Sequence, residues 1–303
     1  MKLAAVSVDL DEIPNYFGIH GLTADAATRT LVYDRAVPRL LDLVRSLGIP
    51  LTLFAVGEDL ARAASAKALR DASDLGHEVA NHTRHHRYDL VRLSPDEMRI
   101  QVEGGAEDIA RATGRRPRGF RAPGYTVTDR LMDVLVEVGV SYDSSVFPCP
   151  AYWLAKASAV GLIRMRGRES KSIVDTPRML TAPTDPYRVG RPYYTRGNGL
   201  LELPILVTRR LRLPVIGTSV TVAGPWGAGR LASACVGAPL LDLELHGIDV
   251  LDSSDGLEAL APYQLDVRVP VARKLAALES VVSVWKRAGY TFVTLEEAAE
   301  AFA

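Results

Sequence analysis

Two acids and a histidine cluster could hold a metal ion. Asp9 and Asp11 lie two residues apart after the apolar run Leu3–Val8, so their side chains project to one side of an extended strand. His82 and His86 are four residues apart and share a face if their segment makes a helical turn. Imidazole and carboxylate groups are favoured ligands of zinc-like ions. We therefore expect two histidines and one acid to form a facial metal site, while the other acid acts as a base.

An arginine and a histidine from later segments could complete a hydrolytic centre. Arg121 can pair with a carboxylate and keep Asp9 ionised and oriented, and the backbone N–H of Tyr125 could face an oxyanion. His246 ends an alternating apolar run and can serve as a general acid. A metal ion could lower the pKa of bound water to about 7 and polarise a carbonyl. Asp9 could then accept the water's proton and His246 could protonate a leaving amine, which together would hydrolyse an amide.

Each cluster alone has a plain structural alternative. Acidic turns are common, histidine clusters occur in solvated loops, and a lone histidine is more often a satisfied structural one. His85 points away from the other two histidines under helical spacing, and His77 precedes a strand, so we interpret both as structural. His20 follows the acid pair in a loop and could line a substrate pocket. Its structural alternative stays open, as does that of His246.

The elements that carry these residues alternate between strand and helix. Short apolar runs predict strands, and one-sided apolar periodicity with Gly or capping signals predicts helices. Such alternation implies a parallel sheet flanked by helices, barrel or open, with chemistry at the carboxyl ends of the strands. The predicted strands are Leu3–Val8, Leu51–Val56, His77–Ala80, Gly119–Arg121, Ser141–Ser144, Leu240–Leu245 and Tyr290–Val293; the predicted helices are Asp34–Leu47, Glu58–Leu75, Ser94 toward Gly114, Asp129–Val138, Val271–Ala288 and a short one after Thr294.

The composition is that of an ordinary globular protein. Of the 303 residues, 48% are apolar and 24% charged, and 36 basic residues balance 36 acidic ones, so nothing favours nucleic acid. Cys149 and Cys235 make no disulfide framework, and we expect reduced, structural thiols. No run approaches the roughly 20 apolar residues of a membrane span, and the first strand begins at once without a signal peptide. We therefore expect a cytoplasmic protein.

These clusters, in this order, resemble the motifs of the polysaccharide deacetylases, also called the NodB-homology or carbohydrate esterase family 4 group. Ser7–Asp11 is similar to the first motif, with Leu10 inserted between the acids as in a branch with peptidoglycan deacetylase-like and allantoinase-like members. The other matches are His82–His86 to His-Ser/Thr-x-x-His, Arg121–Pro123 to Arg-x-Pro, Leu243–His246 to Leu-x-Leu-His, and Tyr142–Pro148 to a segment common in this branch.

The resemblance implies one domain over residues 1–303, a distorted, TIM-like (β/α) barrel of seven strands. It implies Asp9 as base, His246 as acid and Arg121 as support of the base. It further implies Asp11, His82 and His86 as ligands of one divalent ion, zinc first, with cobalt, nickel, manganese or iron as alternatives. Glu202 would stand where the family's fourth motif has an aspartate that orients the histidine. We expect Tyr125, His20 and Glu202 to bind the substrate.

A basic region marks residues 150–235 as an insertion that faces the substrate. Residues 161–212 hold eleven Lys and Arg against four acids, a net +7, among them Arg164, Arg166, Arg168, Lys171, Arg209, Arg210 and Arg212. The excess is either a solvated face or a site for a phosphate-bearing substrate or an anionic membrane surface.

Three functions remain open. The first is removal of an N-acetyl or N-formyl group from an amino sugar, lipid-phosphate-linked or nucleotide-linked, with peripheral contact at the inner membrane surface. The second is hydrolysis of a cyclic amide or ureide, as in the allantoinase-like branch, whose members look metal-free. The third is binding without catalysis. The oligomeric state is open as well.

Overall fold

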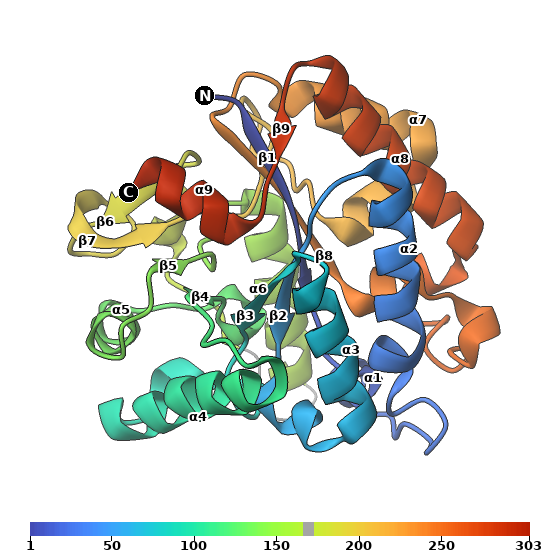
Figure 1. Cartoon of the computed structure of the whole chain (residues 1–303), viewed down its shortest axis with the longest axis horizontal. Helices are drawn as coiled ribbons and strands as arrows, with labels where there is room; N and C mark the ends of the chain where they lie inside the picture. The colour runs from blue at the N-terminus through green and yellow to red at the C-terminus, as the bar shows by residue number, and fades with distance from the viewer. Residues whose placement is uncertain (166–172) are drawn as a thin grey trace.

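A curled, mostly parallel sheet forms the centre of the molecule. The structure is a computed structural model that describes residues 1–165 and 173–303. In these ranges the strand order is β6-β7-β5-β4-β3-β2-β1-β8, with β9 also paired to β1, and β6–β7 is the antiparallel pair (Figure 1). The strands are β1 (Leu3–Asp9), β2 (Thr52–Ala55), β3 (Glu78–Asn81), β4 (Gly119–Phe120), β5 (Tyr142–Asp143), β6 (Tyr187–Val189), β7 (Arg196–Glu202), β8 (Leu240–His246) and β9 (Thr291–Phe292).

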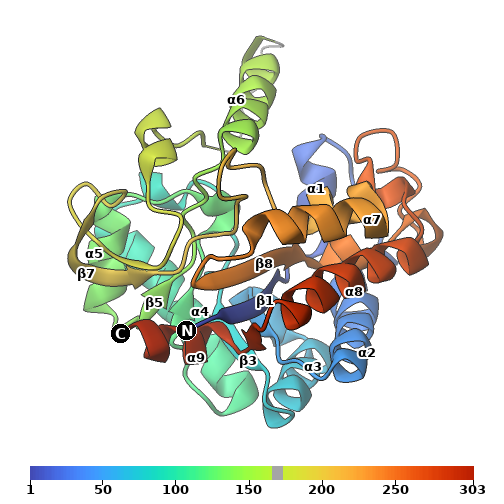
Figure 2. The ribbon, with the colours of Figure 1, turned by 90° about the horizontal axis from the view of Figure 1, so that it is seen from above.

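Helices pack around this sheet, and one of them projects from the molecule. α7 and α8 pack on each other beside β8, while α3 packs on α4 and α4 on α5. Helix α6 stands out from the body, and the two chain termini lie close together (Figure 2). The helices are α1 (Ile13–Ile19), α2 (Val37–Leu47), α3 (Ala63–Asp74), α4 (Pro95–Thr113), α5 (Asp129–Glu137), α6 (Pro150–Met165), α7 (Gly217–Cys235), α8 (Val271–Arg287) and α9 (Leu295–Phe302).

The register of β1 brings the chemistry-bearing residues to one edge. All seven residues of β1 are buried, as expected for a strand covered on both faces. Asp9, at its carboxyl end, is the register partner of Phe54 on β2 and of His246 on β8. Segments far apart in sequence therefore meet at the carboxyl ends of neighbouring parallel strands, as predicted.

The predicted fold class is confirmed, with two corrections. The capping boxes at Ser94 and Thr294 are both formed. The strands in the described ranges number nine rather than seven, because the β6–β7 hairpin extends the sheet and β9 joins β1. In the described ranges the sheet also does not close into a barrel, because its two end strands, β6 and β8, are not paired with each other. An isolated bridge joins Ile216 to Glu244 of β8.

Cys149 and Cys235 are buried free thiols, as expected.

Among the described residues, we find no helix with both the length and the apolar character needed to cross a bilayer.

Candidate active site

Asp11, His82 and His86 converge as a potential metal site. The Asp11 Oδ1 atom lies 3.2 Å from His82 Nε2 and 3.1 Å from His86 Nε2, and all three side chains are buried. Apart from these contacts with one another, Asp11 Oδ1 and both ring nitrogens of His86 have no hydrogen-bond partner within the described residues. Buried polar atoms are rarely left without partners. One carboxylate oxygen and two imidazole nitrogens that point at one another therefore fit a divalent ion in chemistry and in spacing.

A contact behind the site sets the ring orientation of His82. Its Nδ1 atom lies 2.8 Å from the carbonyl oxygen of Arg121. A carbonyl can only accept, so Nδ1 carries the proton and Nε2 presents its lone pair toward Asp11 and His86. The backbone carbonyl of Arg121 thus fixes the tautomer that a metal ligand needs.

The two histidines meet through a tight turn rather than the helical turn that their spacing suggested. Thr83 and His86 have positive φ angles of 69° and 47°. Asn81 Oδ1 accepts a hydrogen bond from the N–H of Thr83, and Thr83 Oγ1 accepts one from the N–H of His86. The rings reach a centroid separation of 4.9 Å. Non-glycine residues in this backbone region are strained and persist where their surroundings hold them.

Arg121 holds Asp9 beside the ligands. Its Nη1 donates to Asp9 Oδ1 at 2.9 Å, and its Nη2 donates to Asp242 Oδ2 at 3.0 Å. Burial lowers the pKa of Arg121, but the carboxylates of Asp9, Asp242 and Glu244 raise it more, so it stays charged. The other oxygen of Asp9 lies 3.8 Å from His82 Nε2 and faces the ligand cluster. The expected pairing of Arg121 with Asp9 is therefore present.

His246 is held between a carboxylate and a phenol. Its Nδ1 lies 3.0 Å from Glu244 Oε1, and its Nε2 lies 3.2 Å from the hydroxyl of Tyr125. Burial lowers the pKa of His246, but the Glu244 carboxylate raises it further, to well above its ordinary value. The raised pKa favours the protonated ring, and Nε2 is the ring nitrogen that faces the Tyr125 hydroxyl.

Glu244 is the functional residue that sequence reasoning missed. It is fully buried and stands two residues before His246 on β8, so the two side chains share a face. The alternation of the closing motif carried this signal, because every second residue from Asp242 to His246 is polar.

The structure places Glu202 elsewhere. It is fully buried, and its Oε1 accepts the N–H of Val146 at 2.9 Å. Burial, and then the neighbouring Asp143 carboxylate, raise the pKa of Glu202 well above its usual range. The carboxylate that contacts His246 is that of Glu244, so Glu202 does not take the orienting position considered for the fourth motif.

Tyr125 stands differently from expectation, and His20 as a residue that lines the substrate pocket stays a prediction. The backbone N–H of Tyr125 donates to the carbonyl of Ala122 at 3.0 Å, so the group of Tyr125 that reaches the site is its phenol and not its amide. His20 stacks on the ring of Tyr263 with centroids 5.1 Å apart.

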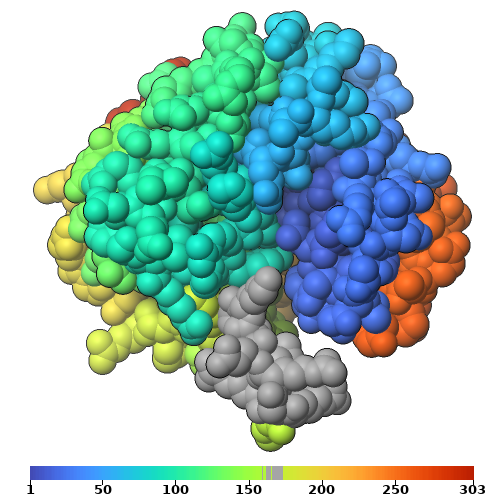
Figure 3. Space-filling view, turned by 90° about the horizontal axis from the view of Figure 1, so that it is seen from below, coloured from blue at the N-terminus to red at the C-terminus, as the bar shows by residue number. Residues whose placement is uncertain are grey.

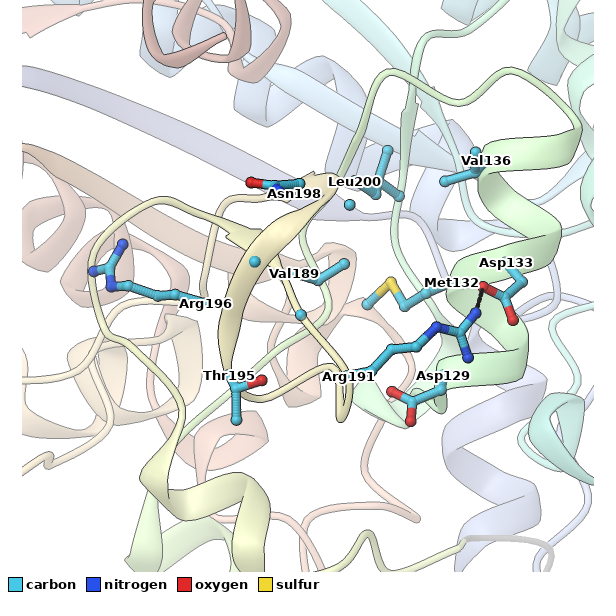
Figure 4. A pocket seen from close by; sticks show the side chains of 13 residues that line it. Asp129, Met132, Asp133, Val136, Val189, Arg191, Thr195, Arg196, Asn198 and Leu200 are labelled. Carbon is cyan, nitrogen blue, oxygen red and sulfur yellow. Dashed lines mark hydrogen bonds and ion pairs between the residues drawn. The ribbon is translucent and has the colours of Figure 1, made fainter.

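The site lies at the carboxyl ends of the strands. Seen from that side, the dark-blue surface that follows β1 lies recessed between the teal surface that follows β3 and the lighter blue surface around α2 (Figure 3). A groove of about 390 Å³ lies elsewhere, between α5 and the β6–β7 hairpin (Figure 4). An ion pair of Arg191 with Asp133 borders this groove. None of the residues that line it belongs to the metal site or to the group around Arg121 and His246.

Comparison with known proteins gives partial sequence matches. The model of the polysaccharide deacetylase family matches residues 19–142, a range that includes His82–His86 and Arg121–Pro123. A peptidoglycan deacetylase of Helicobacter pylori is 26% identical over 147 residues, which are 48% of this chain and 49% of that protein. The peptidoglycan deacetylase-like protein FGM2 of Gibberella zeae is 28% identical over 148 residues, 46% of this chain and 43% of that protein. The matches thus span about half the length of these relatives.

Solved structures match over nearly the whole chain. The Xyl-CE4 domain of a multidomain xylanase from the hindgut metagenome of Trinervitermes trinervoides aligns with a TM-score of 0.52 at 14% identity, over 99% of this chain and 90% of that one. A CE4 family pseudoenzyme of Bacillus anthracis aligns with a TM-score of 0.51 at 14% identity, over 98% and 65%. At such identities the likeness is one of fold.

Proposed function

Because this chain is related to the polysaccharide deacetylases in sequence and has their fold, we propose that it is a metal-dependent N-deacylase of an amino sugar, acting on an N-acetyl or N-formyl group. The observation that supports this most is the convergence of Asp11, His82 and His86 beside an acid held by arginine and a protonated histidine held by a carboxylate. A decayed binding protein would not need all of these groups in place.

The residues around the ligands have complementary roles in amide hydrolysis. A divalent ion, for which we propose zinc, would supply Lewis acidity and a lowered pKa of bound water. Asp9, which is paired with Arg121, accepts a proton from the attacking water as the new carbon–oxygen bond forms. His246 donates the Nε2 proton to the nitrogen as the carbon–nitrogen bond breaks, and Glu244 stabilises the imidazolium before that transfer. The products are a free amine and the acyl acid.

Substitution of a single ligand tests this function. We expect His82→Ala to lose the bound metal, measured by elemental analysis, together with hydrolysis of N-acetyl and N-formyl amino sugars. His85→Ala is the matched control: it lies in the same loop, is exposed, and its Nδ1 faces Gln101 rather than the ligands. A His82→Ala protein that keeps metal and activity would overturn the ligand assignment. A wild-type protein that is active without metal would favour the cyclic amide or ureide alternative.

We propose further that the sugar is carried on a phosphate group, and that the protein touches an anionic membrane surface. Arg209 and Arg210 are exposed beside Leu211, which is 73% exposed, a combination of basic and apolar side chains that suits such a surface. Arg212 instead donates a hydrogen bond to the carbonyl of Leu180, so we interpret its role as structural. Arg166, Arg168, Lys171 and the side chain of Arg164 lie outside the described residues. The cytoplasmic location and the substrate-facing role of residues 150–235 stay predictions.

Charge reversal tests membrane binding separately from amide hydrolysis. The double change Arg209→Glu and Arg210→Glu should abolish co-sedimentation with vesicles that contain phosphatidylglycerol and leave hydrolysis of a free amino sugar unchanged. Binding to such vesicles that survives the reversal would contradict the membrane proposal.

A further inference from the structure

The turn that carries Tyr125 has an unusual backbone. Gly124 and Tyr125 have φ angles of 64° and 57°, so two successive residues lie in the left-handed region. Glycine adopts that region freely, but a tyrosine does so only where its surroundings fix it. Tyr125 is nevertheless the residue whose hydroxyl lies 3.2 Å from His246 Nε2. Something outside the turn must therefore hold it in place.

Lys156 of the projecting helix α6 contacts the turn on both sides of Tyr125. Its Nζ donates to the carbonyl oxygen of Gly124 at 2.7 Å and to the Oγ1 of Thr126 at 3.1 Å. Lys156 is half-buried, and this burial lowers its pKa to about 8. An ammonium group has three N–H donors, and two of them form hydrogen bonds with this turn.

Aromatic packing from α6 and its flank holds the ring itself. The Tyr125 ring lies 5.7 Å from that of Tyr152 on α6 and 5.8 Å from that of Phe147, centroid to centroid. The Lys156 ammonium lies 5.9 Å from the Tyr152 ring centroid. The cavity lined by Tyr125, Tyr152 and Lys156 has a volume of only about 10 Å³, so these side chains pack closely. Helix α6 thus constrains both the backbone and the side chain of Tyr125.

We propose that Lys156 is a positioning residue, which holds the Gly124–Thr126 turn so that the Tyr125 hydroxyl stays against His246. The proposal rests on the proposed function in one respect, the role of His246 as proton donor. Lys156 touches neither the reacting atoms nor the ligand cluster, and it acts through Tyr125. Its removal should therefore slow the proton transfer step, which lowers kcat, and leave KM and metal content nearly unchanged.

A double-mutant cycle tests whether Lys156 acts through Tyr125. Lys156→Met keeps the length of the side chain and removes both hydrogen bonds, while Tyr125→Phe removes only the hydroxyl. We expect each change to lower kcat, by about tenfold for Lys156→Met, because a misplaced catalytic geometry is costly. In the Tyr125→Phe background, Lys156→Met should change kcat by no more than about twofold, since coupled residues are not additive. Lys156→Arg, which keeps the donors, should recover part of the loss. Losses that multiply in the double variant would overturn the proposal.

A second measurement does not depend on activity. The chain has six histidines, so the ring nitrogen signals of His246 can be assigned by NMR. At fixed pH, Lys156→Met and Tyr125→Phe should move the Nε2 signal of His246 in the same direction, because the first displaces the Tyr125 hydroxyl from Nε2 and the second removes it. Lys67→Met, at an exposed lysine of α3, should leave it in place. An unmoved signal in a folded Lys156→Met protein refutes the positioning role. Wild-type protein that hydrolyses no amide refutes the proposed function and leaves this test valid.

Discussion

At the scale of single residues, the acid that orients His246 comes from the same strand. Glu244 is buried under the imidazole, and its two oxygens have no hydrogen-bond partner in the described chain apart from the ion pair with His246. The residue types of the site, two acids, two histidines, an arginine and a terminal histidine, could be predicted from the sequence because they follow strand ends. The partner of His246 could not be predicted, because Glu244 occupies the unspecified position of the Leu-x-Leu-His motif.

Glu244→Gln tests that assignment through the pH dependence of the reaction. The carboxylate raises the pKa of His246, so the proton donor stays protonated to a higher pH than free imidazole would. Without the charge, that pKa falls and the alkaline limb of the kcat profile moves to lower pH. We expect about a tenfold loss at pH 7 and a larger loss above it. Glu258→Gln, at an exposed glutamate, is the control. An alkaline limb that does not move would show that Glu244 has no such role.

At the scale of elements, helices with caps and one-sided periodicity could be predicted, and those without could not. α4 begins with a capping box and ends at Gly114, and both signals are local. α7 has no continuous periodicity: it contains Pro225 after Gly224, whose φ of 69° interrupts the helix. The turn that joins His82 to His86 was also beyond prediction, because its positive φ angles depend on α4 packing against it.

A glycine on α4 permits that packing. A Cβ at Gly105 would lie 2.8 Å from the carbonyl carbon of Thr83 and would collide with the Asn81 side chain. We expect Gly105→Ala to lower the free energy of unfolding by about 1–3 kcal/mol, the usual cost of overpacking, and to weaken metal binding. Gly161→Ala, at an open helical position, should instead be neutral or stabilising by up to about 1 kcal/mol. Denaturant titration measures both. A Gly105→Ala protein as stable as Gly161→Ala would show that the turn can move aside.

At the scale of the whole molecule, a bound ion would tie together segments about 70 residues apart in sequence. Asp11 follows β1 and the two histidines follow β3, with β2 between these strands in the sheet. The ligand atoms gather in the folded chain alone, so an ion that binds there stabilises it by mass action. At 100 times the dissociation constant the gain is about 2.7 kcal/mol, which raises Tm by roughly 5 °C in a chain of this size.

Removal of the ion by a chelator should therefore lower Tm by that amount, and added zinc should restore it, as followed by calorimetry. The Asp11→Asn variant should show no such shift, because a neutral amide is a poor substitute for the Asp11 carboxylate as a ligand. The chain offers a second candidate cluster in Asp9, Glu244 and His246, whose ligand atoms also lie within 4.8 Å of one another. If zinc still raises Tm in Asp11→Asn but not in Glu244→Gln, the ion occupies that cluster instead. His246 would then be a ligand rather than a proton donor, and the division of roles proposed for the site would be reversed.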